Sequence, residues 1–99
     1  MIALEVTLNG KRICVAGAED LSVLHTCVTC CGRLGKRTVP ARPRETVDLF
    51  YSVGGLTARP DPDTDVHMEW KSIAPLGLGD VVQVRIFETE KPDRPRSRR

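Results

Sequence analysis

The 99-residue sequence has no apolar run that approaches the ~20 residues needed to span a bilayer. Its start does not resemble a signal peptide, because MIALEVTLNG alternates apolar and polar residues and lacks a basic beginning followed by an unbroken apolar stretch. We therefore expect no membrane segment and a cytoplasmic location. In that compartment the four cysteines remain free thiols.

Catalytic motifs are equally scarce. No Ser/His/acid order stands out, and Gly54-Gly55 lacks the Lys-Ser/Thr that a phosphate-binding loop requires. We expect no enzymatic activity, no catalytic residue and no cofactor. A hydrophobic content of 40% is nevertheless sufficient for one folded domain with its own core.

Alternating apolar and polar residues predict strands, because successive side chains of a strand point to opposite faces. Asn9-Gly10 separates the first two and is typical of a two-residue hairpin whose turn needs positive φ at both positions. The predicted strands cover residues 2–8, 11–16, 46–53, 66–71 and 81–88.

Residues 20–34 follow the 3.6-residue period of an amphipathic helix instead. Asp20 is placed to cap its amino end and Gly35 to end it. The face expected to cover the sheet comprises Leu21, Leu24, Val28 and Cys31.

The predicted order is two strands, a helix and three strands. This order resembles the β-grasp, or ubiquitin-like, architecture. It implies an α+β fold, a ββαβββ domain over residues 1–90 with a mixed sheet of four or five strands and one helix on one face. LGLGDVVQVRIFE is similar to the closing turn and strand of small sulfur carriers. Those carriers end in Gly-Gly, whereas this chain ends in KPDRPRSRR, which we expect to be a disordered basic tail (91–99) without conjugation chemistry.

The stretch HTCVTCC raises three hypotheses: a metal site, a redox pair and an apolar helix surface. On a helix the four cysteines diverge, and a single C-x-x-C without a second pair is a weak metal signal. A redox C-x-x-C would begin a helix, and these cysteines lie further along it. We therefore expect no metal, and predict a helix seam that contacts a protein partner, a second copy in a homodimer or the chain's own 54–65 loop. The seam comprises Val23, Cys27, Cys30 and Leu34.

The face of the sheet away from the helix is a second predicted protein contact, because aromatic side chains without a covering layer mark interaction surfaces. Its residues are Arg12, Phe50, Gln83, Arg85 and Phe87. We thus expect a small non-catalytic interaction module with a protein partner. The alternative is a nucleic-acid-binding accessory protein that uses this face together with basic residues. Those residues are Lys36, Arg37, Arg42, Arg44, Arg96, Arg98 and Arg99.

Overall fold

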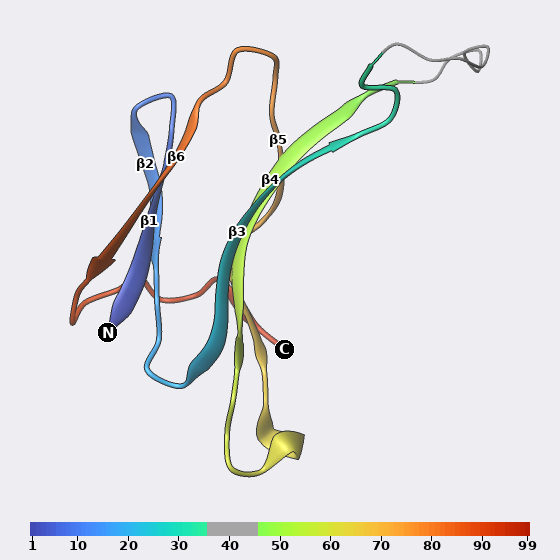
Figure 1. The fold of residues 1–99 in the computed structure, drawn as a ribbon. Coiled ribbons are helices and arrows are strands. Elements are labelled where there is room, and N and C mark those ends of the chain that lie inside the picture. Colours follow the sequence, from blue (N-terminus) through green and yellow to red (C-terminus); the bar gives the residue numbers. More distant parts are fainter. Residues whose placement is uncertain (36–45) are drawn as a thin grey trace.

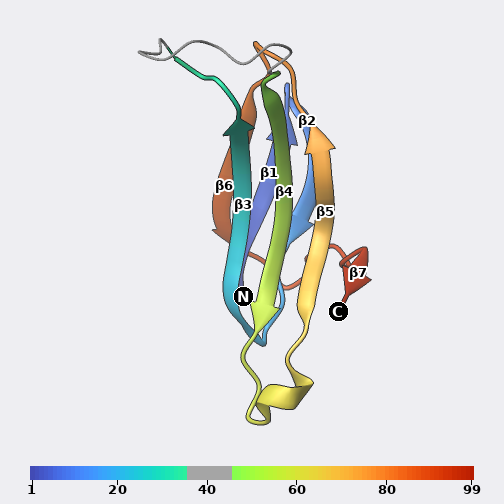
Figure 2. The ribbon, with the colours of Figure 1, turned by 90° about the vertical axis from the view of Figure 1, so that its right-hand side faces the viewer.

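The structure, a computed structural model, describes residues 1–35 and 46–99. Within these residues the chain folds into two antiparallel sheets that face one another (Figures 1 and 2). One sheet has the strand order β2-β1-β6 and the other β3-β4-β5-β7. The elements are β1 (Ile2–Leu8), β2 (Lys11–Ala16), β3 (Leu21–Cys31), β4 (Asp48–Thr57), a short 3-10 helix η1 (Pro62–Thr64), β5 (His67–Pro75), β6 (Val82–Glu88) and β7 (Ser97–Arg98).

The predicted hairpin between β1 and β2 is confirmed. Asn9 and Gly10 have φ values of 52° and 81°, the positive values that a tight two-residue turn requires. The Asn9 side chain also fixes the loop before β6, since its Oδ1 accepts a 2.8 Å hydrogen bond from the Val81 amide. The turn therefore joins β2 to β1 and positions the start of β6.

The predicted helix is wrong, and with it the α+β fold and the ubiquitin-like resemblance. Leu21–Cys31 is a strand of 11 residues, paired antiparallel with β4 from Leu21 opposite Thr57 to Cys31 opposite Asp48. Four residues of this segment are β-branched, which favours a strand: Val23, Thr26, Val28 and Thr29. Pairing with β4 supplies backbone hydrogen bonds, and the periodicity of the sequence does not reveal them. The described residues include no helix with the length and hydropathy to cross a membrane.

Gly54 and Gly55 do not break the strand that contains them. β4 continues through both to Thr57, and the neighbouring backbones come unusually close. A Cβ on Gly55 would lie 2.6 Å from the carbonyl oxygen of Val23, and one on Gly54 would lie 3.0 Å from that of Met68. Glycine therefore lets β3 and β5 approach β4 from its two sides.

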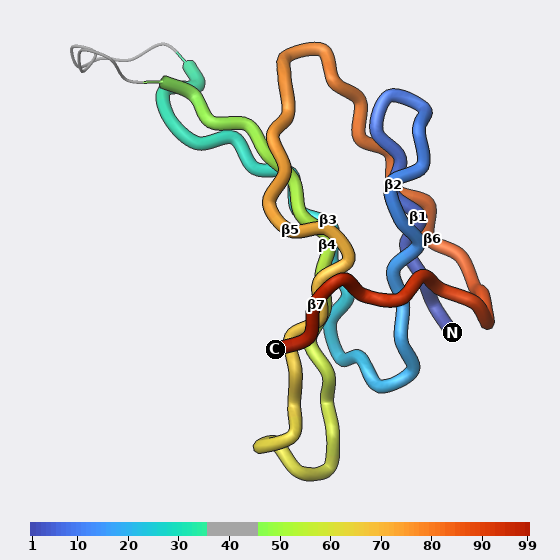
Figure 3. The backbone as a smooth tube through the Cα atoms, turned by 180° about the vertical axis from the view of Figure 1, so that it is seen from behind, coloured from blue at the N-terminus to red at the C-terminus, as the bar shows by residue number. Residues whose placement is uncertain are grey.

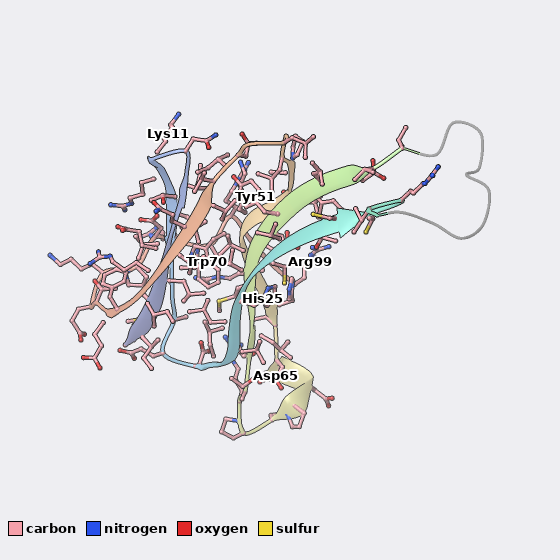
Figure 4. The ribbon with its side chains drawn as sticks, turned by 45° about the horizontal axis from the view of Figure 1, so that its top comes forward. Lys11, His25, Tyr51, Asp65, Trp70 and Arg99 are labelled. Carbon is pink, nitrogen blue, oxygen red and sulfur yellow. The ribbon has the colours of Figure 1, made fainter. Side chains whose placement is uncertain are left out.

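The core lies between the sheets and is built from one face of each. Register places Val6 opposite Cys14 and Leu4 opposite Ala16, so these side chains share the inner face of the first sheet. Trp70 lies between the sheets (Figure 4) and is 3% exposed. The buried cluster comprises Val6, Cys14, Ala16, Val53, Met68 and Trp70. Leu24 packs against it, whereas Val28 and Cys31, which the helical pattern places in the core, are exposed.

The C-terminal segment differs from the expected disordered tail. It crosses from the first sheet to the second (Figure 3), and β7 pairs with Met68 and Glu69 of β5. On the way the Asp93 amide donates to the Val15 carbonyl at 2.8 Å, and the Trp70 indole donates to the Asp93 carbonyl at 2.7 Å. The C-terminal segment is thus positioned by hydrogen bonds between its backbone and distant strands. Such bonds require no apolar side chains in residues 91–99, so hydrophobic patterning does not reveal them.

Candidate functional site

The outer edge of β3 is the main candidate surface. Within the described residues β3 pairs with β4 alone, so the backbone groups on its other side have no strand partner. Figure 2 shows β3 at the margin of the second sheet, with β4 beside it and β5 beyond β4. A row of unpaired amides and carbonyls is a template for another strand.

The other sheet margins are covered or charged. At β2 the Asp93 carboxylate accepts from the Val15 amide at 2.8 Å, in addition to the backbone bond between these residues. β7 covers the start of β5 at Met68 and Glu69, and the uncovered remainder of β5 carries the charged side chain of Lys71. β6 carries the charged side chains of Arg85 and Glu88, which oppose edge-to-edge pairing.

The composition of β3 offers none of these protections. LSVLHTCVTCC contains no Lys, Arg, Asp, Glu or Pro. A long uncharged edge strand without proline is an exposed pairing surface, and proteins ordinarily shield such strands. The one irregularity is a register shift between Leu21 and Val23, at the very start of the strand.

The predicted helix seam is divided between the two faces of β3. Thr26 pairs with buried Val53, so the even-numbered neighbours Leu24, Val28 and Cys30 share the inner face. Val23 and Cys27 lie on the outer face, and Leu34 follows the strand. The four residues therefore do not form one continuous seam, because the period of a strand is two and not 3.6.

An apolar hollow adjoins the distal end of β3. Cys30, Leu49 and Leu78 line two neighbouring cavities of about 190 and 370 Å³. Val28 borders the smaller and Leu34 the larger. Leu78 is 96% exposed and Val28 56% exposed. The hollow extends the apolar surface at this end of the edge.

The structure places four of the five residues of the predicted sheet-face contact on one face of the first sheet. Register places Thr7 between Arg12 and Gln83, and pairs Glu5 with Arg85, on the side of the first sheet away from the core. Phe87 joins them, with the Arg85 guanidinium 4.3 Å from its ring centre. Phe50 does not, because β4 belongs to the other sheet. Phe50 and Phe87 are therefore not neighbours, although the single sheet predicted from the sequence would have placed them side by side.

The basic residues predicted to bind nucleic acid do not form a single patch within the part of the chain that the structure describes. Lys36, Arg37, Arg42 and Arg44 lie outside the described residues. Arg99 is engaged by the carboxylate of Glu69, with its guanidinium 2.6 Å from Oε1. Arg96 and Arg98 are exposed in the C-terminal segment.

The four free cysteines differ sharply in environment. Burial, with the nearby Asp93 carboxylate, raises the pKa of the Cys14 thiol to about 11 from 9.0, whereas the other three cysteines are exposed.

We expect a thiol reagent at pH 8 to modify three thiols quickly and Cys14 slowly, because the thiolate is the nucleophile. Modification of all four at one rate would contradict this placement. Folding raises the pKa of Cys14, so the folded chain favours the protonated thiol over the thiolate. The stability that this preference provides is complete below pH 9 and is lost as the pH rises through about 11.

Within residues 1–35 and 46–99, no group of three or more His, Cys, Asp or Glu side chains has the geometry to hold a metal ion. Cys27 and Cys30 lie on opposite faces of β3, which argues against a C-x-x-C clasp. Comparison of the chain with protein-family models, curated proteins and solved structures finds no match.

Proposed function

We propose that this protein is a small non-catalytic interaction module that binds by strand addition at the free edge of β3. The observation that carries this proposal is an uncharged edge of 11 residues in a fold whose other margins are covered or charged. In strand addition the backbone provides affinity and the side chains on each face provide specificity. The free thiols of all four cysteines support a cytoplasmic location, because that compartment keeps thiols reduced.

The partner that this edge suits best is a second copy of the chain. An antiparallel pair of β3 strands related by a two-fold axis at Thr26 would place Leu24 opposite Val28 of the copy, and Val23 opposite Thr29 of the copy. Apolar and β-branched pairs of this kind stabilise a sheet. No like charges meet along β3, because the strand carries none.

Charges beyond the ends of β3 favour the same arrangement. Glu19 precedes the strand and Arg33 follows it, and both are exposed. With the axis at Thr26, the end of β3 that Glu19 precedes lies beside the end that Arg33 follows in the copy. Opposite charges across an interface select register and orientation. The paired edges would join the two four-stranded sheets into one continuous sheet.

Val28→Lys tests this proposal. We expect the wild-type chain to self-associate reversibly, and weakly, because the proposed contact is confined to two edge strands, whereas stable interfaces bury ~1,200 Å² or more. The lysine would face Leu24 of the copy twice in each dimer, so we expect the dissociation constant to rise about tenfold or more. Sedimentation equilibrium over a wide concentration range measures it.

Ile73→Lys is the matched control. It makes the same kind of change on β5, where Ile73 is 71% exposed, and leaves β3 untouched. Its dissociation constant should equal that of the wild type. A wild-type protein that stays monomeric throughout, or equal losses in both variants, would contradict pairing through β3.

A further inference from the structure

The two histidines of the chain meet on the outer face of the second sheet. His25 projects from β3 (Figure 4) and His67 begins β5, and β4 runs between them. Their rings are stacked with centroids 6.5 Å apart and an interplanar angle of 27°. The sequence contains no other histidine, so the fold brings both of its imidazole rings to one place.

Both rings turn the same nitrogen toward one space, above Gly54. A Cβ built on Gly54 would lie 3.4 Å from His25 Nε2 and 3.4 Å from His67 Nε2. Any other residue at this position would fill that space with its side chain. Glycine therefore leaves an opening on which two imidazole nitrogens converge.

The remaining ring nitrogens face groups that can orient them. His67 Nδ1 lies 3.8 Å from the Glu69 carboxylate, and His25 Nδ1 lies 3.5 Å from the Cys27 sulfur. Glu69 is itself held by Arg99 at 2.6 Å and by the Ser97 hydroxyl at 3.4 Å. A carboxylate behind one nitrogen of a histidine is the usual support of a histidine that ligates metal through the other.

We propose that His25 and His67 bind one divalent transition-metal ion, with zinc as the representative, through their Nε2 atoms above Gly54. Neutral imidazole is a preferred ligand of such ions. Rotation of the two side chains brings Nε2 to the ~2.0–2.1 Å at which zinc binds nitrogen. Because no third ligating side chain joins them in the described residues, water completes the coordination and the ion exchanges readily. The bound ion links β3 to β5 across β4.

Calorimetric titration of the chain with zinc chloride tests the site, and NMR of the imidazole protons locates it. We expect one zinc per chain, with the signals of both histidines moving together as it binds. Binding should also raise the thermal midpoint, because the ion binds only the folded arrangement of the two strands. His25→Ala and His67→Ala should each weaken binding by at least about tenfold, since even a group behind a ligand contributes that much.

Two further variants distinguish binding by the histidines from binding by the thiols of β3. A variant that combines Cys27→Ser, Cys30→Ser and Cys31→Ser should retain zinc binding, because none of these three thiols is a ligand in the proposal. Gly54→Ala keeps both imidazoles but places a methyl group between their Nε2 atoms and 3.0 Å from the Met68 carbonyl oxygen. It should abolish zinc binding, while a cooperative thermal transition of the zinc-free variant shows that the domain still folds. The proposal requires no second copy, so it stands or falls separately from pairing through β3. Absence of zinc binding in the wild type, or binding that survives both histidine substitutions, would overturn it.

Discussion

Trp70→Ala is expected to lower the free energy of unfolding by about 3–5 kcal/mol, the range for removing a large aromatic side chain from a core. Trp70 is 3% exposed and packs with Val6, Val53 and Met68 in the cluster that joins the sheets. Its indole also donates to the Asp93 carbonyl at 2.7 Å, so the substitution removes a link to the C-terminal segment as well. Urea unfolding measures the change.

Leu78→Ala provides the control, because Leu78 is 96% exposed and its loss should change stability by less than about 0.5 kcal/mol. The two substitutions separate a core position from an exposed one. If Trp70→Ala cost less than about 1 kcal/mol, the indole would not be packed between two sheets, and the described core would be wrong.

Deletion of residues 91–99 is expected to lower the thermal midpoint by at least about 10 °C. The segment supplies the Asp93 backbone bonds to Val15 and Trp70, the Asp93 carboxylate bond to the Val15 amide, and β7. Net contributions near 1 kcal/mol for each bond add up to roughly 3 kcal/mol, and each kcal/mol corresponds to about 4–8 °C in a domain of this size.

Asp93→Ala separates the contribution of the Asp93 carboxylate from that of the rest of the C-terminal segment. It removes the carboxylate from the Val15 amide and from Arg12, but keeps the main chain that accepts from Trp70. Differential scanning calorimetry should therefore give a fall smaller than that of the deletion. An unchanged midpoint after deletion is the outcome expected of a disordered tail, and it would refute the described role of this segment.

Local signals in the sequence predict part of this fold. Asn9-Gly10 specifies its turn because few other dipeptides accept two positive φ values. Alternation identifies β1 and β2 with their observed bounds, and β5 and β6 to within a few residues. These strands each have one face toward a core, which is the condition that produces alternation.

The strand β3 could not be recognised from periodicity, because its apolar residues at 21, 24, 28 and 31 also satisfy a helical pattern. Two other properties oppose a helix. Apart from Leu21 and Leu24, the strand β3 contains none of the strong helix formers, and its four Val and Thr residues lose side-chain freedom in a helix. A surface helix would also be expected to carry charges on its polar side, and this segment has none.

The candidate sites depend on which strands become neighbours, and a sequence pattern does not contain that information. The β3 edge is open because β4 lies on one side of it and no described strand lies on the other. His25 and His67 meet because β3 and β5 flank a glycine of β4. Each segment alone contains a single histidine, so the pair becomes visible only in the folded chain.

The most direct measurement of strand addition is residue-resolved amide hydrogen exchange at low and high protein concentration. In an edge strand alternate amides face away from the neighbouring strand, and in β3 these should exchange rapidly in dilute solution. We predict that alternate amides between Leu21 and Cys31 become protected as the concentration rises, while those on the outer edge of β6 do not change. Self-association without added protection in β3, or protection confined to β6, would contradict strand addition at this edge.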